Sequence, residues 1–338
     1  SCWLIMKAMN LSATIITQIP YSTVYIKPLT QGYVAIAYAI IFITFQSKPA
    51  RKPLLWLFLF ITGSLVGYIL IPNHDMTVTY LDVGQGDATL IETPKGKTIL
   101  IDGGNQKLNY KTQEILIDQG ERTLLPVLKH KGINKIDLII VTHFDRDHFG
   151  GIPFILNNFP VGMVIDNGQI LSKNKSYINI IQKKNIPRIK AIAGQSITLD
   201  NHVTLDILSP FTTPPYDKKE NNNSITIKLS YRDIDFLFTG DSEKEVEHHL
   251  AKYYGANLDV EVLKVGHHGS NTSSSSIFLN QVTPEHSIIS SGRKNRYGHP
   301  TKKVLQRLNR YGKVHRTDKN GAITIQTDGK TLNVNHYL

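Results

Sequence analysis

The sequence predicts an α/β fold in which two sheets carry helices on their outer faces, preceded by membrane-spanning helices. Two sets of β-rich runs, each followed by helices, predict the layered part. The absence of Asp and Glu from the first 72 of the 338 residues predicts the membrane part. We therefore expect a membrane region over residues 1–72 and a separate α/β domain over residues 73–338.

Two apolar runs predict the membrane helices. LLWLFLFITGSLVGYILI, residues 54–71, is uncharged over 18 residues, and a spanning helix needs roughly 17 to 25. YVAIAYAIIFITF, residues 33–45, is shorter and could be a short span, the visible end of one or a buried hairpin arm. A pair of core helices in a soluble protein is the alternative for both runs, and the missing acidic residues argue against it.

The charges between these runs predict the orientation. QSKPARKP carries three positive charges, which the positive-inside rule places in the cytoplasm. If both runs span, residues 73–338 lie outside the cytoplasm. The chain starts at Ser1 without the layout of a signal peptide, so we expect a fragment of a larger, multi-pass membrane protein. Its single cysteine, Cys2, cannot form an internal disulfide and does not indicate a compartment.

The soluble part begins with three expected strands, at residues 77–83, 87–93 and 97–104, joined by the turns GQG and PKG. Strand and helix alternation then predicts a helix ending at Gly132, a buried strand at 135–142, and helices at 152–158 and 176–185. The second set is expected as strands at 203–208, 224–231, 234–240 and 259–266, with a helix at 242–255. The end predicts helices at 273–282 and 301–312, a strand at 286–291 and two closing strands.

The segment LIIVTHFDRDHFGG, residues 138–151, carries the densest group of ionisable side chains. In an extended segment His143, Asp145 and Asp147 point the same way, and His148 follows at the turn into the next helix. Imidazole and carboxylate groups at this density repel or desolvate one another unless a cation neutralises them. The pattern therefore predicts a metal site, with a solvated acidic turn as the alternative.

Other apolar strands also end in residues of the kind that bind metals. Asp241 follows DFLFTG, His267 and His268 follow VEVLKVG, and Asp102 follows TILI. Taken alone, Asp241 could be a helix N-cap and Asp102 an Asp-Gly turn. Together these strand ends predict one constellation, because α/β sheets hold ligands at the carboxyl ends of their strands.

These motifs resemble a known family. THFDRDHFGG, FTGD and GHHGS look like the metallo-β-lactamase superfamily, whose αββα sandwich carries a two-metal hydrolase site. LDVGQGDATLI, LIDGG, LKVGHHGSNTSSSSIFL and ISSGRKNRYGHP resemble, more narrowly, the C-terminal domain of the ComEC family of bacterial DNA-uptake competence proteins. The resemblance covers about residues 77–338, and the preceding hydrophobic run is similar to the end of that family's membrane channel region.

The resemblance implies roles for single residues. It places His143 and Asp145 on the first metal ion, Asp147 and His148 on the second, Asp241 between the two, and one of His267 and His268 in a coordination sphere. We take His267 as the ligand candidate and Asp147, Asp241 and His268 as the catalytic candidates, although the sequence does not decide between the two adjacent histidines. Asp102 resembles the aspartate that orients a ligand histidine.

The metal is expected to be a hard one. Asp145 stands where the superfamily usually has a histidine, and carboxylate oxygen is a harder ligand than imidazole. The middle histidine of many members also has no counterpart, because the corresponding region reads ENNNS and His202 lies within an expected strand. We therefore expect two divalent ions, with Mn²⁺ or Mg²⁺ favoured and Zn²⁺ possible.

The expected reaction is metal-dependent hydrolysis of the DNA backbone, as single strand or duplex. Asn295, Tyr297 and His299 are the candidate substrate contacts, with a basic surface loop as the alternative. Five of the 38 basic residues lie in residues 1–72 and all 27 acidic ones lie beyond, so the net charge of residues 73–338 is about +6, which is weak support for nucleic acid. The substrate therefore rests on the resemblance.

The resemblance also implies a setting. The domain would act on the extracytoplasmic side of the bacterial inner membrane, beside other DNA-uptake proteins, in natural transformation. Two alternatives stay open: a non-catalytic domain that guides DNA, and a hydrolase of the same fold that acts on a small ester or phosphodiester. A narrow, uncharged pocket in place of an open basic groove would mark the small-substrate hydrolase.

Overall fold

The computed structural model describes most of the chain from residue 75 onward. The described residues are 75–337 without 110, 113 and 213–218, together with 3, 6, 7, 12, 38, 41, 56–61, 63 and 64. Contacts divide the chain into two compact units, residues 1–71 with 126–134 and residues 72–125 with 135–338. Within the described residues, we find no helix with the length and apolar character that crossing a membrane requires. Most of residues 33–45 and 54–71 lies outside the described residues, so the membrane helices and the boundary at residue 72 stay predictions.

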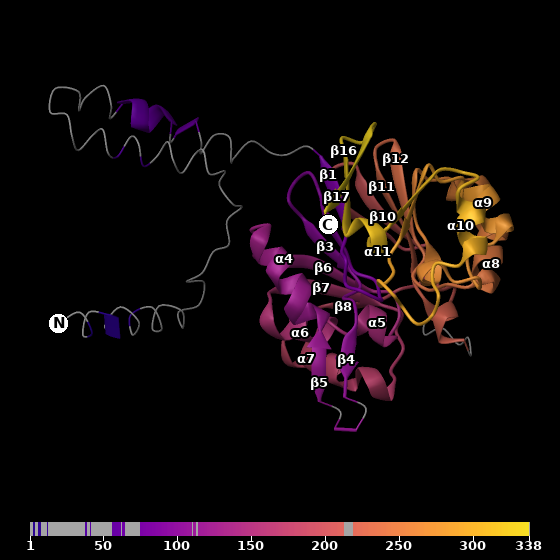
Figure 1. Ribbon diagram of the computed structural model, residues 1–338, viewed down its shortest axis with the longest axis horizontal. Helices are drawn as coiled ribbons and strands as arrows, with labels where there is room; N and C mark the ends of the chain where they lie inside the picture. Colours follow the sequence, from indigo (N-terminus) through magenta and orange to yellow (C-terminus); the bar gives the residue numbers. More distant parts are fainter. Residues whose placement is uncertain are drawn as a thin grey trace. The chain divides into compact units, whose positions relative to one another are not determined.

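Two large sheets form the second unit (Figure 1). The eight-stranded sheet contains, in spatial order, β17 (Leu332–Tyr337), β16 (Ala322–Thr327), β1 (Met76–Tyr80), β2 (Thr89–Glu92), β3 (Thr98–Ile101), β6 (Ile136–Val141), β7 (Val161–Asp166) and β8 (Arg188–Lys190). The seven-stranded sheet contains β15 (Lys313–Arg316), β14 (His286–Ile289), β13 (Val262–Lys264), β12 (Ile234–Phe238), β11 (Thr226–Tyr231), β10 (Val203–Ser209) and β9 (Ser196–Asp200). A small hairpin is formed by β4 (Gln106–Leu108) and β5 (Ile115–Asp118).

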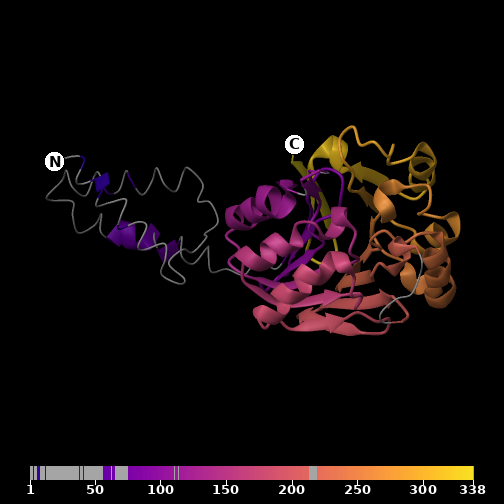
Figure 2. The same ribbon diagram turned by 90° about the horizontal axis from the view of Figure 1, so that it is seen from below.

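Short helices connect the strands. The α-helices are α4 (Leu125–His130), α5 (Arg146–Phe149), α6 (Ile152–Asn158), α7 (Lys175–Lys183), α8 (Lys244–Tyr254), α9 (Ser276–Val282), α10 (Lys302–Leu308) and α11 (Thr317–Asn320). One π-helical turn is η1 (Gly120–Leu124). The 3₁₀ turns are η2 (Ser172–Asn174), η3 (Glu220–Asn223), η4 (Gly255–Leu258) and η5 (Gly266–Gly269). Figure 2 shows helices along the outer sides of the two sheets.

The alternation of side chains along the strands explains the layers. On β6, Leu138 and Ile140 point into the core between the sheets, where they join Phe236 of β12. On the seven-stranded sheet, Leu237 points the other way and packs with Leu250 of α8 and with residues of α9 and α10. On the eight-stranded sheet, Ile139 of β6 points away from Leu138 and Ile140 and is also buried. Both sheets therefore bury residues on both faces, and the predicted αββα sandwich is confirmed.

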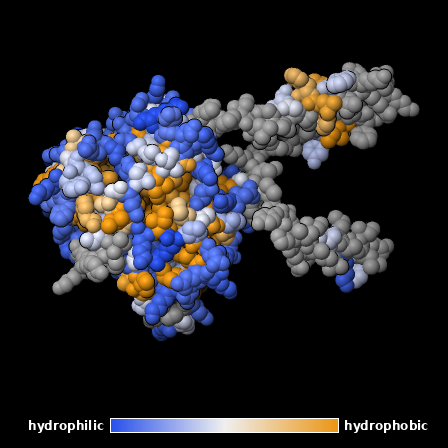
Figure 3. Space-filling view, turned by 180° about the vertical axis from the view of Figure 1, so that it is seen from behind, coloured by the Kyte–Doolittle hydropathy of each residue, from blue (hydrophilic) through white to orange (hydrophobic). Residues whose placement is uncertain are grey.

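Several short features were not predicted, and the two expected closing strands are three, β15, β16 and β17, with α11 between the first two. The β4–β5 hairpin and strands β8 and β9 consist of three to five residues each and are partly exposed, so no strong apolar alternation marks them. On the face of the molecule that Figure 3 shows, hydrophobic residues lie in small groups separated by hydrophilic ones. The hairpin matters for function because its residues line the cleft described below.

Candidate metal centre

Strands from both sheets end at the candidate centre. β3 and β6 are parallel neighbours in one sheet, and β12 and β13 are parallel neighbours in the other. The carboxyl ends of parallel neighbours lie at one edge, which brings Asp102, His143, Asp241 and His268 to the same side of the sandwich. All four side chains are buried.

A group of four buried side chains lies at this edge. Asp87, His148, Asp241 and His268 each offer a ligand atom, and these atoms lie within 4.8 Å of one another. His148 Nε2 is 3.0 Å from Asp241 Oδ1, and His268 Nε2 is 3.7 Å from Asp241 Oδ2. Asp147 adjoins the group, since its Oδ2 lies 3.2 Å from His268 Nε2. Imidazole nitrogens and carboxylate oxygens in one buried place form a ligand set for a divalent cation.

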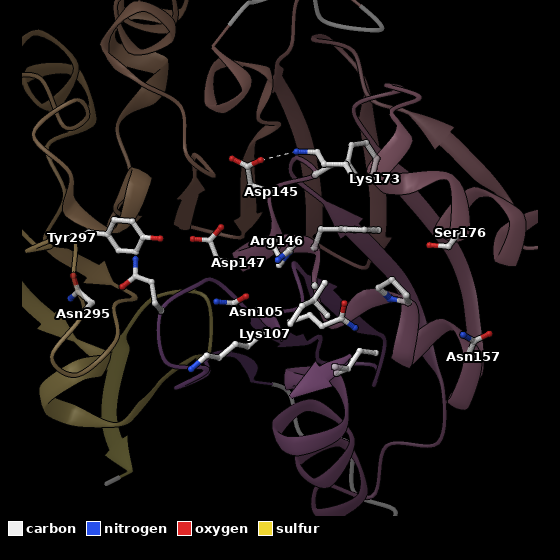
Figure 4. A pocket seen from close by; sticks show the side chains of 18 of the residues that line it. Asn105, Lys107, Asp145, Arg146, Asp147, Asn157, Lys173, Ser176, Asn295 and Tyr297 are labelled. Carbon is white, nitrogen blue, oxygen red and sulfur yellow. Dashed lines mark hydrogen bonds and ion pairs between the residues drawn. The ribbon is translucent and has the colours of Figure 1, made fainter. Parts of the chain in front are cut away.

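His143 and Asp145 lie beside this group. His143 is completely buried, its ring centroid is 4.3 Å from that of His148, and its Nε2 is 3.7 Å from Asp145 Oδ2. The Asp145 carboxylate is 33% exposed and accepts a hydrogen bond of 2.8 Å from Lys173 Nζ (Figure 4). Lys173 also contacts Glu220. Asp145 is therefore shared between the buried centre and an ion-pair network at the surface.

The two adjacent histidines of GHHGS separate in space. Both have left-handed backbone angles, with φ of 49° at His267 and 53° at His268, which residues with a Cβ adopt only where the surroundings enforce it. His268 Nδ1 is 3.0 Å from the Ser290 carbonyl, so its Nε2 faces the buried group. His267 Nδ1 is 3.0 Å from Thr272 Oγ1, and its Nε2 stays 3.9 Å from Asp241. His268 is thus inside the group and His267 lies at its rim.

Asp102 holds the His148 ring. Its carboxylate accepts hydrogen bonds from the Thr142 backbone N–H at 2.8 Å and from the Thr142 hydroxyl at 2.7 Å. His148 Nδ1 lies 2.7 Å from Asp102 Oδ2. With Nδ1 as the donor, the lone pair of His148 Nε2 points into the centre, which is the arrangement that fixes the tautomer of a metal-binding histidine.

Two residues at the centre, Asp87 and Lys264, were not predicted from the sequence. Asp87 Oδ2 accepts a hydrogen bond of 2.6 Å from the buried Lys264 Nζ, and Asp87 Oδ1 is 3.3 Å from His268 Nδ1. A Cβ on Gly86 would meet the Asp147 carbonyl oxygen at 2.2 Å, so the GQGD turn packs directly on α5. The sequence offered two signals: Asp87 follows a tight glycine turn, and Lys264 interrupts the apolar run VLKV.

The electrostatics of the centre follow from its carboxylates. Burial opposes protonation of His148 and His268, but Asp241 and Asp102 raise the pKa of His148 well above its usual value, and Asp241 and Asp87 raise that of His268 to about 10. Burial likewise opposes ionisation of Asp241, yet His148 and His268 hold the pKa of Asp241 well below its usual value. The centre therefore requires positive charge, which protons or divalent cations can supply.

Unpartnered atoms support a cation. Asp87 Oδ1, His143 Nε2, His148 Nε2 and Asp241 Oδ1 are buried and make no hydrogen bond of good geometry, although His148 Nε2 and Asp241 Oδ1 lie 3.0 Å apart and Asp87 Oδ1 lies 3.3 Å from His268 Nδ1. Buried polar atoms are rarely left in this state, and the four atoms belong to side chains that surround one place. The residues present therefore fit divalent metal ions.

A cleft of about 1240 Å³ opens beside the centre. Asp145 and Asp147 lie on one wall, and residues 105–108 and 115 of the β4–β5 hairpin region contribute another part (Figure 4). Four basic side chains also line this cleft: Lys107, Arg146, Lys173 and Arg296.

The predicted substrate contacts differ in position. Tyr297 lines the cleft and is 53% exposed, and the Arg296 guanidinium lies over its ring, 5.1 Å from the centroid. Asn295 also lines the cleft, but its amide donates to the carbonyls of Gly292 and His299 and so holds the loop. The His299 ring packs against His267, with centroids 5.7 Å apart. The structure thus brings Tyr297 to the cleft and His299 to the rim of the centre.

Comparisons with known proteins agree with this architecture. ComE operon protein 3 of Bacillus subtilis is 33% identical over 254 residues, which cover 73% of this chain and 32% of that protein. Competence protein ComA of Neisseria gonorrhoeae is 32% identical over 75% of this chain and 32% of its own length. Recombination protein 2 of Haemophilus influenzae is 34% identical over 73% of this chain and 28% of its own length. The chain therefore spans about a third of the length of these relatives.

The match to a family description covers most of the sandwich. Residues 81–293 match the family described as the metallo-beta-lactamase superfamily. This range begins after β1 and includes every residue of the buried group. The chain belongs to the metallo-beta-lactamase superfamily, and its sequence is similar to competence proteins.

Proposed function

We propose that this chain is a metal-dependent nuclease that hydrolyses DNA phosphodiester bonds during DNA uptake. The observation that carries the proposal is a buried Asp and His centre that borders a cleft lined by basic side chains. A phosphodiester is anionic, so its hydrolysis needs both positive charge at the reacting phosphate and cationic contacts along the chain.

The geometry favours a particular set of ligands. We assign His148, Asp241 and His268, with the adjoining Asp147, to one ion, and His143 and Asp145 with Asp241 to a second. His268 is the better ligand of the histidine pair, because it faces the group while His267 contacts Thr272. The carboxylate-rich set favours Mn²⁺ or Mg²⁺ over Zn²⁺. Divalent ions at such a centre neutralise phosphate oxygens and lower the pKa of an attacking water.

The remaining roles fall to this chain's own side chains. Asp102 orients the ring of His148, and the Ser290 carbonyl orients that of His268, with Asp87 Oδ1 3.3 Å from the same His268 nitrogen. Lys264 balances the charge of Asp87 without reaching the cleft, since it is almost fully buried. His267 and His299 lie at the rim, where their imidazoles can contact the phosphate, and Tyr297 offers a ring for stacking on a base.

The cleft and the centre also favour the nuclease over the small-substrate hydrolase and the DNA-guiding domain. A small-ester hydrolase would have a narrow, uncharged pocket, whereas this cleft is open and carries Lys107, Arg146, Lys173 and Arg296. A domain that only guides DNA would not need four buried metal-binding side chains whose ligand atoms lie within 4.8 Å of one another. Both observations favour the nuclease.

The proposed setting rests on the relatives and on the N-terminal residues. Two of the similar proteins are named Competence protein ComA and Recombination protein 2. Among the described N-terminal residues, Trp56 and Phe60 are each 72% exposed, as side chains that contact lipid would be. We place the chain in the bacterial inner membrane, with the sandwich outside the cytoplasm and other DNA-uptake proteins as partners.

The reaction can be tested directly. The purified chain is incubated with single-stranded and duplex DNA in the presence of Mn²⁺, Mg²⁺ or Zn²⁺, beside the Asp147→Ala and Asp241→Ala variants. Asp233→Asn, at an exposed carboxylate on a turn of the sandwich, is the matched control. We expect cleavage with Mn²⁺ or Mg²⁺ by the wild type and the control, and none by the two centre variants.

Each negative result has a meaning. DNA binding without cleavage under any metal would refute the nuclease and favour a guiding domain. Hydrolysis of bis(4-nitrophenyl) phosphate without cleavage of DNA would favour the small-diester hydrolase. Separately, cysteines introduced beyond residue 72 should be labelled from outside the cytoplasm, and labelling from the cytoplasm alone would contradict the orientation.

A further inference from the structure

Three histidines occupy inward-facing strand positions at one corner of the sandwich. His286 on β14 shares the face of Ile288, which lies in the core between the sheets, and His315 on β15 pairs with Ile288 across the strands. His336 on β17 pairs with Ile323, another core residue. Imidazoles thus continue the inward-facing rows of β14, β15 and β17 at this corner, where His286 and His315 are partly buried and His336 is exposed.

The three rings form a row, here called the histidine ladder (His286, His315 and His336). His286 Nδ1 is 3.0 Å from His315 Nε2, and His315 Nδ1 is 3.0 Å from His336 Nε2. The ring centroids are 5.2 Å apart in both pairs. The ladder joins the two sheets, because β14 and β15 belong to one sheet and β17 to the other.

The surroundings favour the neutral forms of His286 and His315. Burial lowers the pKa of His286, with Lys313 adding to the effect and Glu285 opposing it. Burial, and then the neighbouring rings of His286 and His336, lower the pKa of His315 to about 4. Neutral imidazoles keep a lone pair on one nitrogen, which is the form that binds metals.

We propose that the ladder is a second metal site, in which His315 Nδ1 and His336 Nε2 bind a divalent copper ion. With bonds of about 2.0 Å, two nitrogens 3.0 Å apart subtend an angle of roughly 90–100° at the metal. This angle suits neighbouring positions of a tetragonal Cu²⁺ or Ni²⁺ sphere better than the wider angle of tetrahedral Zn²⁺. His336 is exposed, so solvent can complete the sphere.

His286 acts as a positioning residue. If His315 donates from Nε2 to His286 Nδ1, its Nδ1 carries the lone pair that the metal needs. His336 donates to the same Nδ1 when no metal is bound, and on binding its proton moves from Nε2 to Nδ1 by exchange with solvent. No net proton is released by this shift, and the bound ion links β15 to β17.

The test separates the ladder from the catalytic centre. The full chain and its ladder variants are titrated with Cu²⁺ and followed by calorimetry and by electron paramagnetic resonance. Because Cu²⁺ also displaces Mn²⁺ from the catalytic centre, the ladder is identified by the difference between the wild type and these variants. We expect a bound copper with nitrogen ligands in the wild type that is missing in His315→Gln and His336→Gln. His286→Gln should weaken this binding by about 10–100-fold, the usual effect of removing an orienting partner.

The controls make the outcome decisive. His248→Gln, at an exposed histidine on α8, should bind copper as the wild type does. His315→Gln should keep its Mn²⁺-dependent hydrolysis, and circular dichroism shows whether it is folded. The exposed His336 provides a second variant that disturbs the core less. If both variants bind the same number of copper ions with unchanged affinity and spectra, the proposed site does not exist.

Discussion

The two histidine groups of this sandwich have opposite electrostatic surroundings. At the metal centre, Asp241 and Asp87 raise the pKa of His268 to about 10 in spite of burial. In the histidine ladder, burial and two neighbouring imidazoles lower the pKa of His315 to about 4. Burial acts in the same direction in both places, so the neighbouring charges decide the outcome. The centre attracts cations strongly, whereas His286 and His315 offer neutral nitrogens.

The largest expected effect comes from removing the carboxylate that faces both sides of the centre. Asp241→Ala should lower kcat/KM for DNA cleavage by about 10⁴-fold. This corresponds to about 5.5 kcal/mol of activation free energy, at 1.36 kcal/mol for each factor of ten. Asp241 Oδ1 contacts His148 and Oδ2 faces His268, so no neighbour replaces it. Steady-state kinetics with Mn²⁺ measures the change. A loss of less than tenfold would show that the centre does not depend on this carboxylate.

The second effect concerns stability. Lys264→Met should lower the free energy of unfolding by about 3–5 kcal/mol, because it leaves the buried Asp87 carboxylate without its cation. Denaturant unfolding measures this loss. The double variant Asp87→Asn/Lys264→Met should recover most of it, since both charges are then gone. No recovery would mean that Lys264 matters for packing rather than for charge balance.

The third effect is smaller and concerns metal affinity. Asp102→Asn should weaken Mn²⁺ binding by about 10–100-fold, because Asp102 fixes the His148 ring through Nδ1. Calorimetric titration of the two proteins measures the ratio. Asp233→Asn serves as the control. Equal affinities in wild type and Asp102→Asn would place His148 outside the coordination sphere.

The smallest effect tests the ladder by pH. A histidine whose pKa is lowered on folding stabilises the fold above the unfolded pKa of about 6.5, and this contribution is lost as pH falls toward about 4. The groups around His315 are His286, His336 and Lys313, so protonation there adds charge to an already positive corner. Because the rings are half-buried, we expect about 1 kcal/mol after screening. Unfolding in urea from pH 7 to pH 4 should show a shallower loss in His315→Gln than in the wild type.

The sequence predicted the layers better than the details of the centre. The alternation around Leu138 and Ile140 and the apolar strand before Asp241 made the two buried sheets predictable. The hairpin at Gln106–Asp118 was missed because its strands are short and partly exposed. The membrane runs lie mostly outside the described residues, and the roles of the site residues stay predictions.

Asp87 and Lys264 show why part of the centre could not be found in the sequence. Their contact joins residues 177 positions apart, and the sequence around each residue gives no indication of the other. GQG was interpreted as a turn, which explains the glycines but not the carboxylate after them. The histidine pair was undecided for a similar reason, because only the left-handed backbone at His267 and His268 separates the two rings.

The centre is assembled from segments that are distant in the chain, which has a consequence for folding. Asp147 and His268 are 121 positions apart, and one follows a strand of the first sheet while the other follows a strand of the second. Contacts of such long range form slowly, after local elements have paired. Tight metal binding therefore becomes available only when the two sheets have docked. Acquisition of the metal ion would report the completion of folding, and a nascent chain would have no hydrolytic activity before that step.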